Sequence, residues 1–427
     1  MQTVEKVTLF SAKKDYFFFV GIALTLLSFS LSYEYYKYKQ LTKFDSQLSD
    51  VTVVKAYNKT KLTKNGKIKS YKVLRLSSDD GFVFYTVAKK NLQNLQNKRL
   101  HVELWAGNIS FKEYLKGFFA FSKILKIYEK PTLKQKTASF IDAQHTNSEI
   151  AKLYKALFLA LPLPTSIQTQ FSNLGISHLI AISGFHLGVL AALLFFLFKY
   201  PYKFLQNRYF PYRSYKRDSF LFISLVLLGY LLFLDSPPSL LRAYVMLVVG
   251  FVLYDRGMQI VSMQTLLLTV LLILALFPKL LLSIGFWLSV SGVFYIFLFL
   301  LHCKECSKLT QFLLLPFWVY LMMLPFSMAI FGNFSLYHPL SILWTTLFTL
   351  FYPLAIALHV MGLGNLLDVP LAYLLHVNTH ALQHTLAKVY LFIEVVLSLA
   401  AVFSKKALYA LLGYTLLLFV YFIYNVA

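Results

Sequence analysis

The feature that most constrains this chain is a long succession of apolar segments in its second half. From residue 174 onward, long apolar stretches alternate with short polar ones over nearly the whole sequence. A stretch of about 20 apolar residues can cross a bilayer as a helix. Across 427 residues, 58% are hydrophobic and 14% charged, whereas soluble domains have about 25% charged residues. The composition therefore excludes a soluble enzyme and an intrinsically disordered chain.

The apolar segments predict a polytopic α-helical membrane protein with about nine or ten transmembrane helices. The first segment is interpreted as an uncleaved anchor helix, since it is long for a signal peptide. The segments lie at residues 16–33, 174–198, 219–234, 239–254, 263–282, 284–301, 309–331, 338–361, 389–403 and 407–424. The stretch 366–388 is amphipathic and too polar for an easy span.

The polar part of the chain, residues 37–155, holds most of the positive charge, with 24 lysines and arginines against 9 acidic residues. Apolar and polar side chains alternate from Val51, and Lys64-Asn65-Gly66-Lys67 contains the Asn-Gly pair that a type I′ hairpin turn favours. Further strands are expected at 82–87 and 100–105. Several short strands of this kind predict a small β-barrel or sandwich.

Between this β block and the next long span, residues 111–155 change to a helical, amphipathic pattern. Aromatic and aliphatic residues such as Phe118, Phe121 and Leu125 lie among lysines. A helix of this composition is suited to lying on a membrane surface. We therefore expect interfacial helices over residues 111–160.

Basic residues in the loops set the expected orientation, because lysine and arginine concentrate on the cytoplasmic side of membrane proteins. The loop between spans 174–198 and 219–234 has six basic residues and one acidic residue, Asp218. This loop is therefore predicted to be cytoplasmic. The β block then lies on the outer side of the membrane.

The densest group of polar and small residues inside an apolar segment runs from Gly175 to Gly188. It contains His178, Ser183, Gly184 and His186. Polar groups at membrane depth face either a partner or a water-filled path. We interpret these four residues as candidates for lining a channel. A closely packed helix face with satisfied polar groups is the alternative.

Two later segments add candidates for the same path. Arg242 has a fixed charge and a planar guanidinium suited to phosphate, and Asp235 is its expected partner. A structural ion pair at the start of a helix is the alternative. Ser239, Ser289 and Ser291 complete the set of channel-lining candidates.

The basic β block is suited to nucleic acid, because lysines neutralise phosphates and aromatic rings stack on bases. A surface that faces anionic lipid would carry similar residues. The DNA-binding candidates are Lys55, Lys59, Lys61, Lys64, Lys67, Lys69, Tyr71, Lys72, Arg75 and Trp105, with Tyr57, Phe84, Tyr85 and His101 nearby.

Four segments, in this order, resemble the ComEC competence-channel family. They are His178–Gly188, Ser236–Met246, Ser283–Ser291 and Phe331–Ser335. The resemblance implies a channel that carries transforming DNA, as a single strand, across the bacterial cytoplasmic (inner) membrane. It also implies an OB-like fold for the β block, which occupies the position of the family's OB-like domain. Many members carry a metallo-hydrolase-like domain with a His-x-His-x-Asp-His motif, which this sequence lacks, so we expect a short form that is not an enzyme.

The resemblance and the composition together predict five parts of the chain and several partners. The parts are an anchor helix (1–36), a basic OB-like domain (37–110), interfacial helices (111–160), a channel domain (161–365) and a C-terminal segment with the last spans (366–427). Expected partners are single-stranded DNA and the lipid bilayer. From the family we also expect a periplasmic DNA receptor and cytosolic single-strand-binding or motor proteins.

Two other functions remain open from the residues alone. Ser183 and His186 are three positions apart and could form a hydrolytic dyad in the membrane. The chain could also transport another anionic polymer or a lipid-linked substrate. The sequence contains no P-loop motif, and we expect no cofactor.

Two smaller motifs carry weaker hypotheses. His376, His380 and His384 have the spacing of one helix face and are weak candidates for a metal site. The polar face of an interfacial helix and a proton-responsive face are the alternatives. Cys303 and Cys306 form a single CxxC pair, which is half of a zinc site, and we expect two reduced thiols in a cytosolic loop.

Overall fold

The computed structural model describes residues 12–62, 68–89, 95–128, 131–377, 379 and 381–426. The chain divides into two compact units, which we call the barrel unit and the helical unit. The barrel unit comprises Phe17–Phe140 and Leu272–Ser283, and the helical unit comprises Met1–Tyr16, Ile141–Leu271 and Ile284–Ala427.

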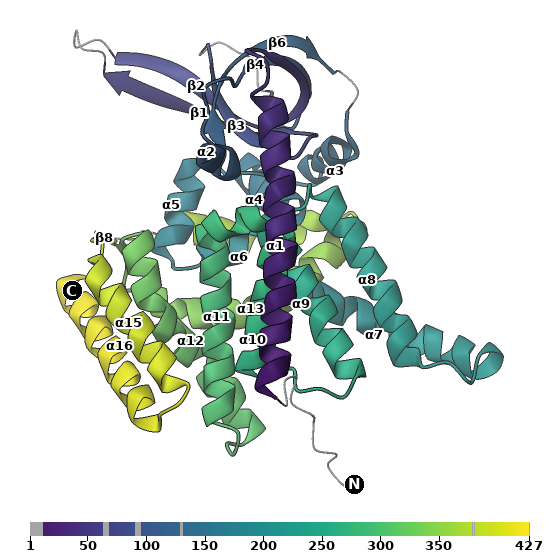
Figure 1. Ribbon diagram of the computed structural model, residues 1–427, viewed down its shortest axis with the longest axis vertical. Coiled ribbons are helices and arrows are strands. Elements are labelled where there is room, and N and C mark those ends of the chain that lie inside the picture. The colour runs from purple at the N-terminus through teal and green to yellow at the C-terminus, as the bar shows by residue number, and fades with distance from the viewer. Residues whose placement is uncertain are drawn as a thin grey trace. The chain divides into compact units, whose positions relative to one another are not determined.

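Six strands form one mixed sheet in the barrel unit (Figure 1). They are β1 (Gln47–Leu62), β2 (Ile68–Ser78), β3 (Val83–Ala88), β4 (Arg99–Trp105), β5 (Phe118–Phe119) and β6 (Phe121–Ile127). Their order in the sheet is β5-β3-β2-β1-β4-β6. Only Ala120 separates β5 from β6 along the chain, so the two edges of the sheet meet and the sheet closes into a barrel.

The alternation of the strands explains the core of the barrel. Val51, Val53, Leu100 and Val102 are completely buried, as the period-two pattern requires. A β-bulge follows Val53 and shifts the alternation of β1 by one residue. The predicted strands at 82–87 and 100–105 are confirmed by β3 and β4.

The prediction of interfacial helices over residues 111–160 is wrong in its central part. Helix α2 (Phe111–Lys116) ends at Gly117, which has a φ of 93° that favours glycine. The chain then forms β5 and β6, and β6 pairs with β4 along its length. The backbone of this segment therefore bonds to a sheet edge instead of to itself. Helices α3 (Leu133–Asp142) and α4 (Ser148–Leu159) follow.

The anchor helix α1 (Lys13–Leu41) and the short helix η1 (Pro278–Leu282) complete the barrel unit. Glu34 of α1 joins them, because its carboxylate lies 2.9 Å from Lys279 Nζ and accepts a 3.0 Å hydrogen bond from Tyr114 Oη of α2. Three segments that are far apart in the sequence therefore meet at one acidic side chain.

The helical unit consists mainly of helices. They are α4, α5 (Thr165–Asn173), α6 (Ser177–Ile180), α7 (Gly184–Tyr209), α8 (Tyr215–Phe233), α9 (Pro238–Asp255), α10 (Met263–Leu276), α11 (Ile284–His302), α12 (Lys308–Ile330), α13 (Ser341–Val360), α14 (Asp368–His376), α15 (Lys388–Ala401) and α16 (Lys405–Val426). Two short strands, β7 (Asn333–Phe334) and β8 (Leu382–Gln383), pair with each other, and η2 (His338–Leu340) and η3 (Gly364–Leu367) flank α13.

Helices α7, α8 and α9 pack together, and α12 packs with α11, α15 and α16. Figure 1 shows α15 and α16 side by side at the C-terminal end.

Seven helices in the described part of the chain are long and apolar enough to cross a membrane: α1, α7, α9, α11, α12, α13 with η2, and α16. This confirms a polytopic membrane protein with a small β domain. The larger predicted number included α8, which begins with three charged residues at 216–218, and α10 and α15, which have 14 residues each. The span predicted from residue 174 begins at Gly184, because Gly175 has a φ of 73° and α6 is only four residues long.

Candidate functional sites

One face of the barrel gathers cations and tyrosines. The antiparallel register places Lys55 opposite Arg75, and Arg75 opposite Tyr85. It also places Lys59 opposite Tyr71. Directly paired residues lie on the same side of a sheet, and every second residue of a strand shares that side. The five residues therefore lie on one face of the sheet formed by β1, β2 and β3.

This surface, which we call the basic face, also includes Tyr57, whose ring centroid lies 5.9 Å from Lys55 Nζ. Lys59 and Arg75 are exposed, whereas Lys55, Tyr71 and Tyr85 are half-buried. Like charges directly opposite each other destabilise a sheet, so the Lys55–Arg75 pair favours an anion between or above the two cations. Cations beside aromatic rings form a surface suited to phosphates and stacked bases.

The structure separates the predicted DNA-binding residues into groups. Lys55, Lys59, Tyr71 and Arg75 lie on the basic face. Lys72 lies on the opposite side of the hairpin, where it pairs with Asn58 and Ala88, and Trp105 is an exposed residue of β4 opposite Phe121. Lys64 and Lys67 fall outside the described residues, as do the side chains of Lys61 and Lys69, whose backbones pair across the hairpin.

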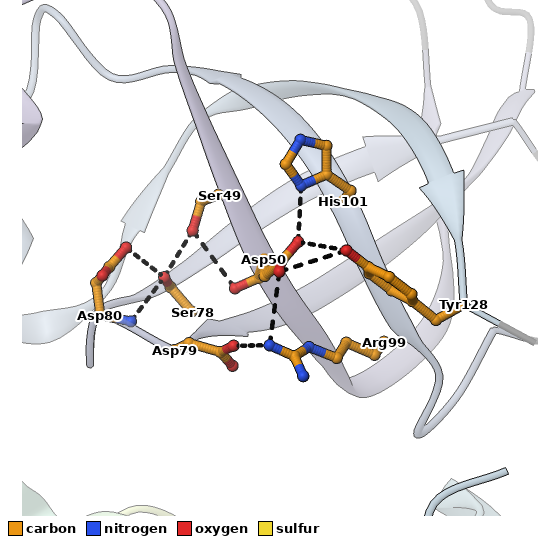
Figure 2. A network of polar contacts seen from close by, with 8 residues as sticks. All are labelled: Ser49, Asp50, Ser78, Asp79, Asp80, Arg99, His101 and Tyr128. Atoms are coloured by element: carbon orange, nitrogen blue, oxygen red, sulfur yellow. Dashed lines mark hydrogen bonds and ion pairs between the residues drawn. The ribbon is translucent and has the colours of Figure 1, made fainter. Parts of the chain in front are cut away.

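A second polar cluster of the barrel surrounds Asp50 (Figure 2). Oδ1 of Asp50 lies 2.7 Å from His101 Nδ1 and accepts a 3.1 Å hydrogen bond from Tyr128 Oη. Arg99 lies 3.5 Å from the other carboxylate oxygen and also pairs with Asp79. The His101 hydrogen bond, with Tyr128 and Arg99, lowers the pKa of Asp50 below its ordinary value. This cluster holds a charged acid by means of its own donors and joins β1 to β4.

Three of the four segments that resemble the competence family meet in the helical unit. Ser239 Oγ donates a 2.6 Å hydrogen bond to the carbonyl of Ile182. Arg242 donates through Nε to the carbonyl of Pro238 at 3.0 Å, and through a terminal nitrogen to that of Gly285. A Cβ on Gly184 would lie 3.2 Å from Cβ of Ala243, so this glycine lets α7 approach α9. The residues between α6 and α7, the start of α9 and the start of α11 therefore form one junction.

The fourth segment, Phe331–Ser335, contacts residues that lie just before the first segment in the sequence. Asn333 Nδ2 donates to Ser172 Oγ at 2.8 Å and to Asn173 Oδ1 at 3.0 Å. His338 Nε2 lies 2.9 Å from the Ser172 carbonyl. A Cβ on Gly175 would lie only 3.0 Å from Cα of His338, so this position needs glycine for both its positive φ and its packing.

The predicted channel-lining residues occupy different environments at this junction. Arg242 is 5% exposed and His186 is 1% exposed, so neighbouring helices enclose both side chains. His178 is exposed, with Nε2 3.2 Å from Thr345 Oγ1. Ser289 and Ser291 are half-buried in α11. The role of all these residues as channel lining stays a prediction.

The expected pairing of Arg242 with Asp235 also stays a prediction, since the two Arg242 hydrogen bonds given above go to backbone carbonyls. Asp235 and Ser236 both have positive φ values, 62° and 50°, in the turn between α8 and α9. Positive φ is unfavourable for residues with a Cβ. The turn is therefore strained immediately before the two prolines that begin α9.

Ser183 and His186 form a helix cap at the start of α7. His186 Nδ1 lies 3.3 Å from the Ser183 backbone nitrogen and 3.1 Å from Ser183 Oγ. Since that backbone N–H donates to Nδ1, the ring proton lies on Nε2, which is buried without a hydrogen-bond partner in the described structure. A catalytic histidine needs an acceptor that orients its second nitrogen. The geometry therefore favours a capping role over a hydrolytic dyad.

An apolar groove lies beside this cap, between α7 and α13. It is lined by Phe185, Gly188, Val189, Ala192, Leu193, Thr349 and Pro353. These side chains offer almost no polar group to a phosphate. The groove is therefore suited to lipid chains rather than to a charged polymer.

Sequence spacing gave no signal for a buried cluster formed by His145, His359 and Asp368. His145 Nδ1 lies 2.8 Å from Asp368 Oδ1, and its Nε2 lies 3.0 Å from His359 Nε2. His359 Nδ1 donates to the carbonyl of Ala355 at 2.7 Å, and the ring of Tyr154 stacks on His145 with centroids 4.7 Å apart. More than 200 residues separate His145 from its partners in the sequence, so only the fold brings them together.

The predicted helix face of three histidines is wrong. Helix α14 ends at His376, and His384 follows the short strand β8. His380 lies outside the described residues. A strand cannot continue the helical spacing, so the face predicted to carry a metal does not form. Within the described ranges, no group of three or more suitable side chains could hold a metal ion.

The two units define a polytopic α-helical membrane protein with an attached basic β-barrel. The family model described as "Competence protein" matches residues 162–426, which is more than half of the chain. The chain therefore belongs to the competence protein family, of the ComEC type, and has a role in DNA uptake. A search of curated proteins and a search of solved structures return no significant match.

Proposed function

We propose that this protein conducts single-stranded DNA across the bacterial cytoplasmic membrane during natural transformation, with the barrel unit on the outer side. The family supports a role in DNA uptake. The observation that carries the proposal is the basic face, where Lys55 stands directly opposite Arg75 and tyrosines flank both. A DNA strand supplies both the phosphates that relieve this repulsion and the bases that stack on the rings.

Capture and passage are separate steps in this proposal. Stacking contributes about 1–3 kcal/mol per base without depending on base sequence, and phosphate contacts weaken steeply with salt. At the junction, Arg242 is enclosed by its two carbonyl partners. Passage then requires α9 and α11 to move apart, so that a phosphate oxygen replaces the Gly285 carbonyl of α11 as an acceptor for the guanidinium.

The central experiment follows labelled DNA in a strain that lacks this protein. Uptake to a nuclease-protected state outside the cytoplasmic membrane and arrival in the cytoplasm are scored separately. We expect the first to persist and the second to be lost. Unchanged arrival in the cytoplasm would reject the channel.

The basic face can be tested with the full chain in lipid nanodiscs. Replacing Lys59 and Arg75 by glutamate should weaken binding of a single-stranded oligonucleotide by about tenfold or more, with a reduced salt dependence. Lys72→Glu is the matched control, since Lys72 belongs to the same strand and lies on the opposite side of the hairpin. The double variant reverses two charges and the control one, so an equal loss per reversed charge would mean that overall charge, rather than this face, binds DNA.

A further inference from the structure

Glu394 is a completely buried acidic residue in α15, with 0% exposure. Its Oε1 accepts a 3.1 Å hydrogen bond from Tyr295 Oη of α11, and this hydroxyl also lies 2.8 Å from Ser398 Oγ. Its Oε2 is buried and has no hydrogen-bond partner in the described structure. Buried polar groups in proteins are nearly always paired, so an orphaned carboxyl oxygen calls for an explanation.

Among the described residues, no lysine, arginine or histidine forms an ion pair with the Glu394 carboxyl group. The hydroxyl groups found around Glu394 in the described structure come from Tyr295 of α11, Ser398 of α15 and Tyr414 of α16. Within the described helices α11, α12, α15 and α16, every lysine stands at a helix start, at positions 308, 388, 405 and 406. His302 stands at the end of α11, where Nε2 lies 2.8 Å from the carbonyl of Ala401.

An isolated carboxylate in such a site is strongly unfavourable, so the side chain avoids the cost by holding a proton. The apolar residues around it belong to four packed helices, with Leu298, Met322 and Leu411 completely buried in the same cluster as Tyr295. Acidic residues within the membrane part of transporters are characteristic of proton pathways. The orphaned oxygen is the atom that carries an exchangeable proton in this arrangement.

We propose that Glu394 is a proton-binding site of the helical unit, and that release and uptake of its proton accompany DNA passage. The second half of this statement rests on the proposed function. Release leaves a carboxylate with a single donor, Tyr295, so the contact between α11 and α15 has to open and admit water to Oε2. Uptake of a proton restores the dry, packed contact seen here. No other reactant takes part in this step.

The proton can be detected without any transport assay. Dicyclohexylcarbodiimide partitions into apolar sites, where the O–H of a protonated carboxyl group adds across one of its C=N bonds. The proton goes to nitrogen and the carboxyl oxygen to carbon, and the resulting O-acylisourea rearranges to a stable N-acylurea. The full chain in nanodiscs is treated with this reagent, digested and examined by mass spectrometry. We expect the label on Glu394 and not on Glu305, which is exposed in the loop after α11. A labelled Glu305 with an unlabelled Glu394 would overturn the proton site.

The link to transport is tested with Glu394→Gln, which keeps the size and the acceptor oxygen but removes the exchangeable proton. We expect normal protein amounts, normal outer DNA uptake and transformant numbers reduced by about tenfold or more. Glu305→Gln is the matched control, since it makes the same change in an acid that is exposed in the loop after α11, and it should transform within about twofold of the wild type. Glu394→Gln that transforms like the wild type would overturn the link.

The two proposals fail in different ways. If strains with and without the protein import DNA equally, the proposed channel fails, whereas carbodiimide labelling of Glu394 still decides the proton site. If Glu394→Gln does not accumulate in the membrane, Glu394→Asp keeps the carboxyl group and provides the second variant. Glu394→Asp must then retain labelling, and loss of the label at normal protein amounts would contradict the proposal.

Discussion

Asp50 of the barrel unit and Glu394 of the helical unit are both acids in hydrogen-bonded clusters, yet their surroundings differ sharply. The Asp50 carboxylate contacts His101, Tyr128 and Arg99, and its side chain is 31% exposed. Glu394 has one donor, Tyr295, and is fully buried. Water and three donors let the barrel keep a charged acid, whereas the apolar helices favour a neutral one. The same functional group therefore stabilises one unit as an ion and is proposed to serve the other as a proton carrier.

The largest effect is expected from a charge placed in the buried site. Glu394→Lys should destabilise the helical unit by more than about 3 kcal/mol, because a buried ammonium group would have no acid to pair with. Asp50→Lys is the comparison, since its partially exposed side chain can reach water. Thermal unfolding in detergent, together with the amount of protein in the membrane, measures both. Similar stabilities for the two variants would contradict the contrast between the clusters.

Removing one hydroxyl donor from each cluster should give a smaller difference in stability loss between the two units. Tyr295→Phe leaves Glu394 without a donor and should cost about 1–3 kcal/mol, the cost of an unsatisfied buried polar group. Tyr128→Phe should cost less than about 1 kcal/mol, because Asp50 keeps His101, Arg99 and water. Denaturation midpoints of the two variants provide the test. A larger loss for Tyr128→Phe would reverse the comparison.

The pH dependence of the barrel follows from the lowered pKa of Asp50. Because its pKa in the folded protein lies below its unfolded value of about 3.9, Asp50 stabilises the fold above that pH. This contribution is lost as the pH falls through the lower, folded value. Hydrogen exchange in β1 and β4 should therefore be slower in the wild type than in Asp50→Asn at pH 6. This difference in exchange rate, the gap between the two proteins, should become smaller toward pH 3. A gap that stays constant over this range would contradict the role of the Asp50 charge.

The smallest effect is expected for Arg99, which lies at the outer side of the barrel cluster with a side chain that is 47% exposed. Arg99→Gln should change the stability of the barrel by less than about 1 kcal/mol, because water screens exposed ion pairs. High salt should reduce this difference further. Thermal unfolding at low and high salt measures it, and a loss as large as that of Tyr295→Phe would show that Arg99 is more than a screened partner.

Local sequence patterns predicted the elements whose conformation follows from the residues of the element itself. The strand expected at residues 100–105 is β4, in which Leu100 and Val102 alternate with more exposed residues and are buried. The strand from Phe121 to Ile127 was missed because its sequence also fits an amphipathic helix. It becomes a strand because β4, once it is paired with β1, offers an unpaired edge, and that edge comes from a distant part of the sequence.

The candidate sites also combine features that the sequence shows with contacts that only the fold creates. The residues of the basic face were recognised from charge and aromatic content, but the cross-strand pairing of Lys55 with Arg75 required the register. Composition identified Arg242 as notable, although its carbonyl partners on two helices were not visible in the sequence. The cluster of His145, His359 and Asp368 carried no spacing signal at all.

Hydropathy, charge and strand patterns identify a basic, multi-pass membrane protein with a β block, and four ordered segments resemble the competence family. Hydrophobicity and charge are properties of single residues and short segments, so they can be obtained from the sequence without knowing which segments are in contact. The folded structure was needed to show which side chains are buried and which are exposed. It also showed that Glu394 is buried with a single hydrogen-bond donor. Burial and pairing depend on contacts between distant segments, and the same carboxyl group takes its charge state from them.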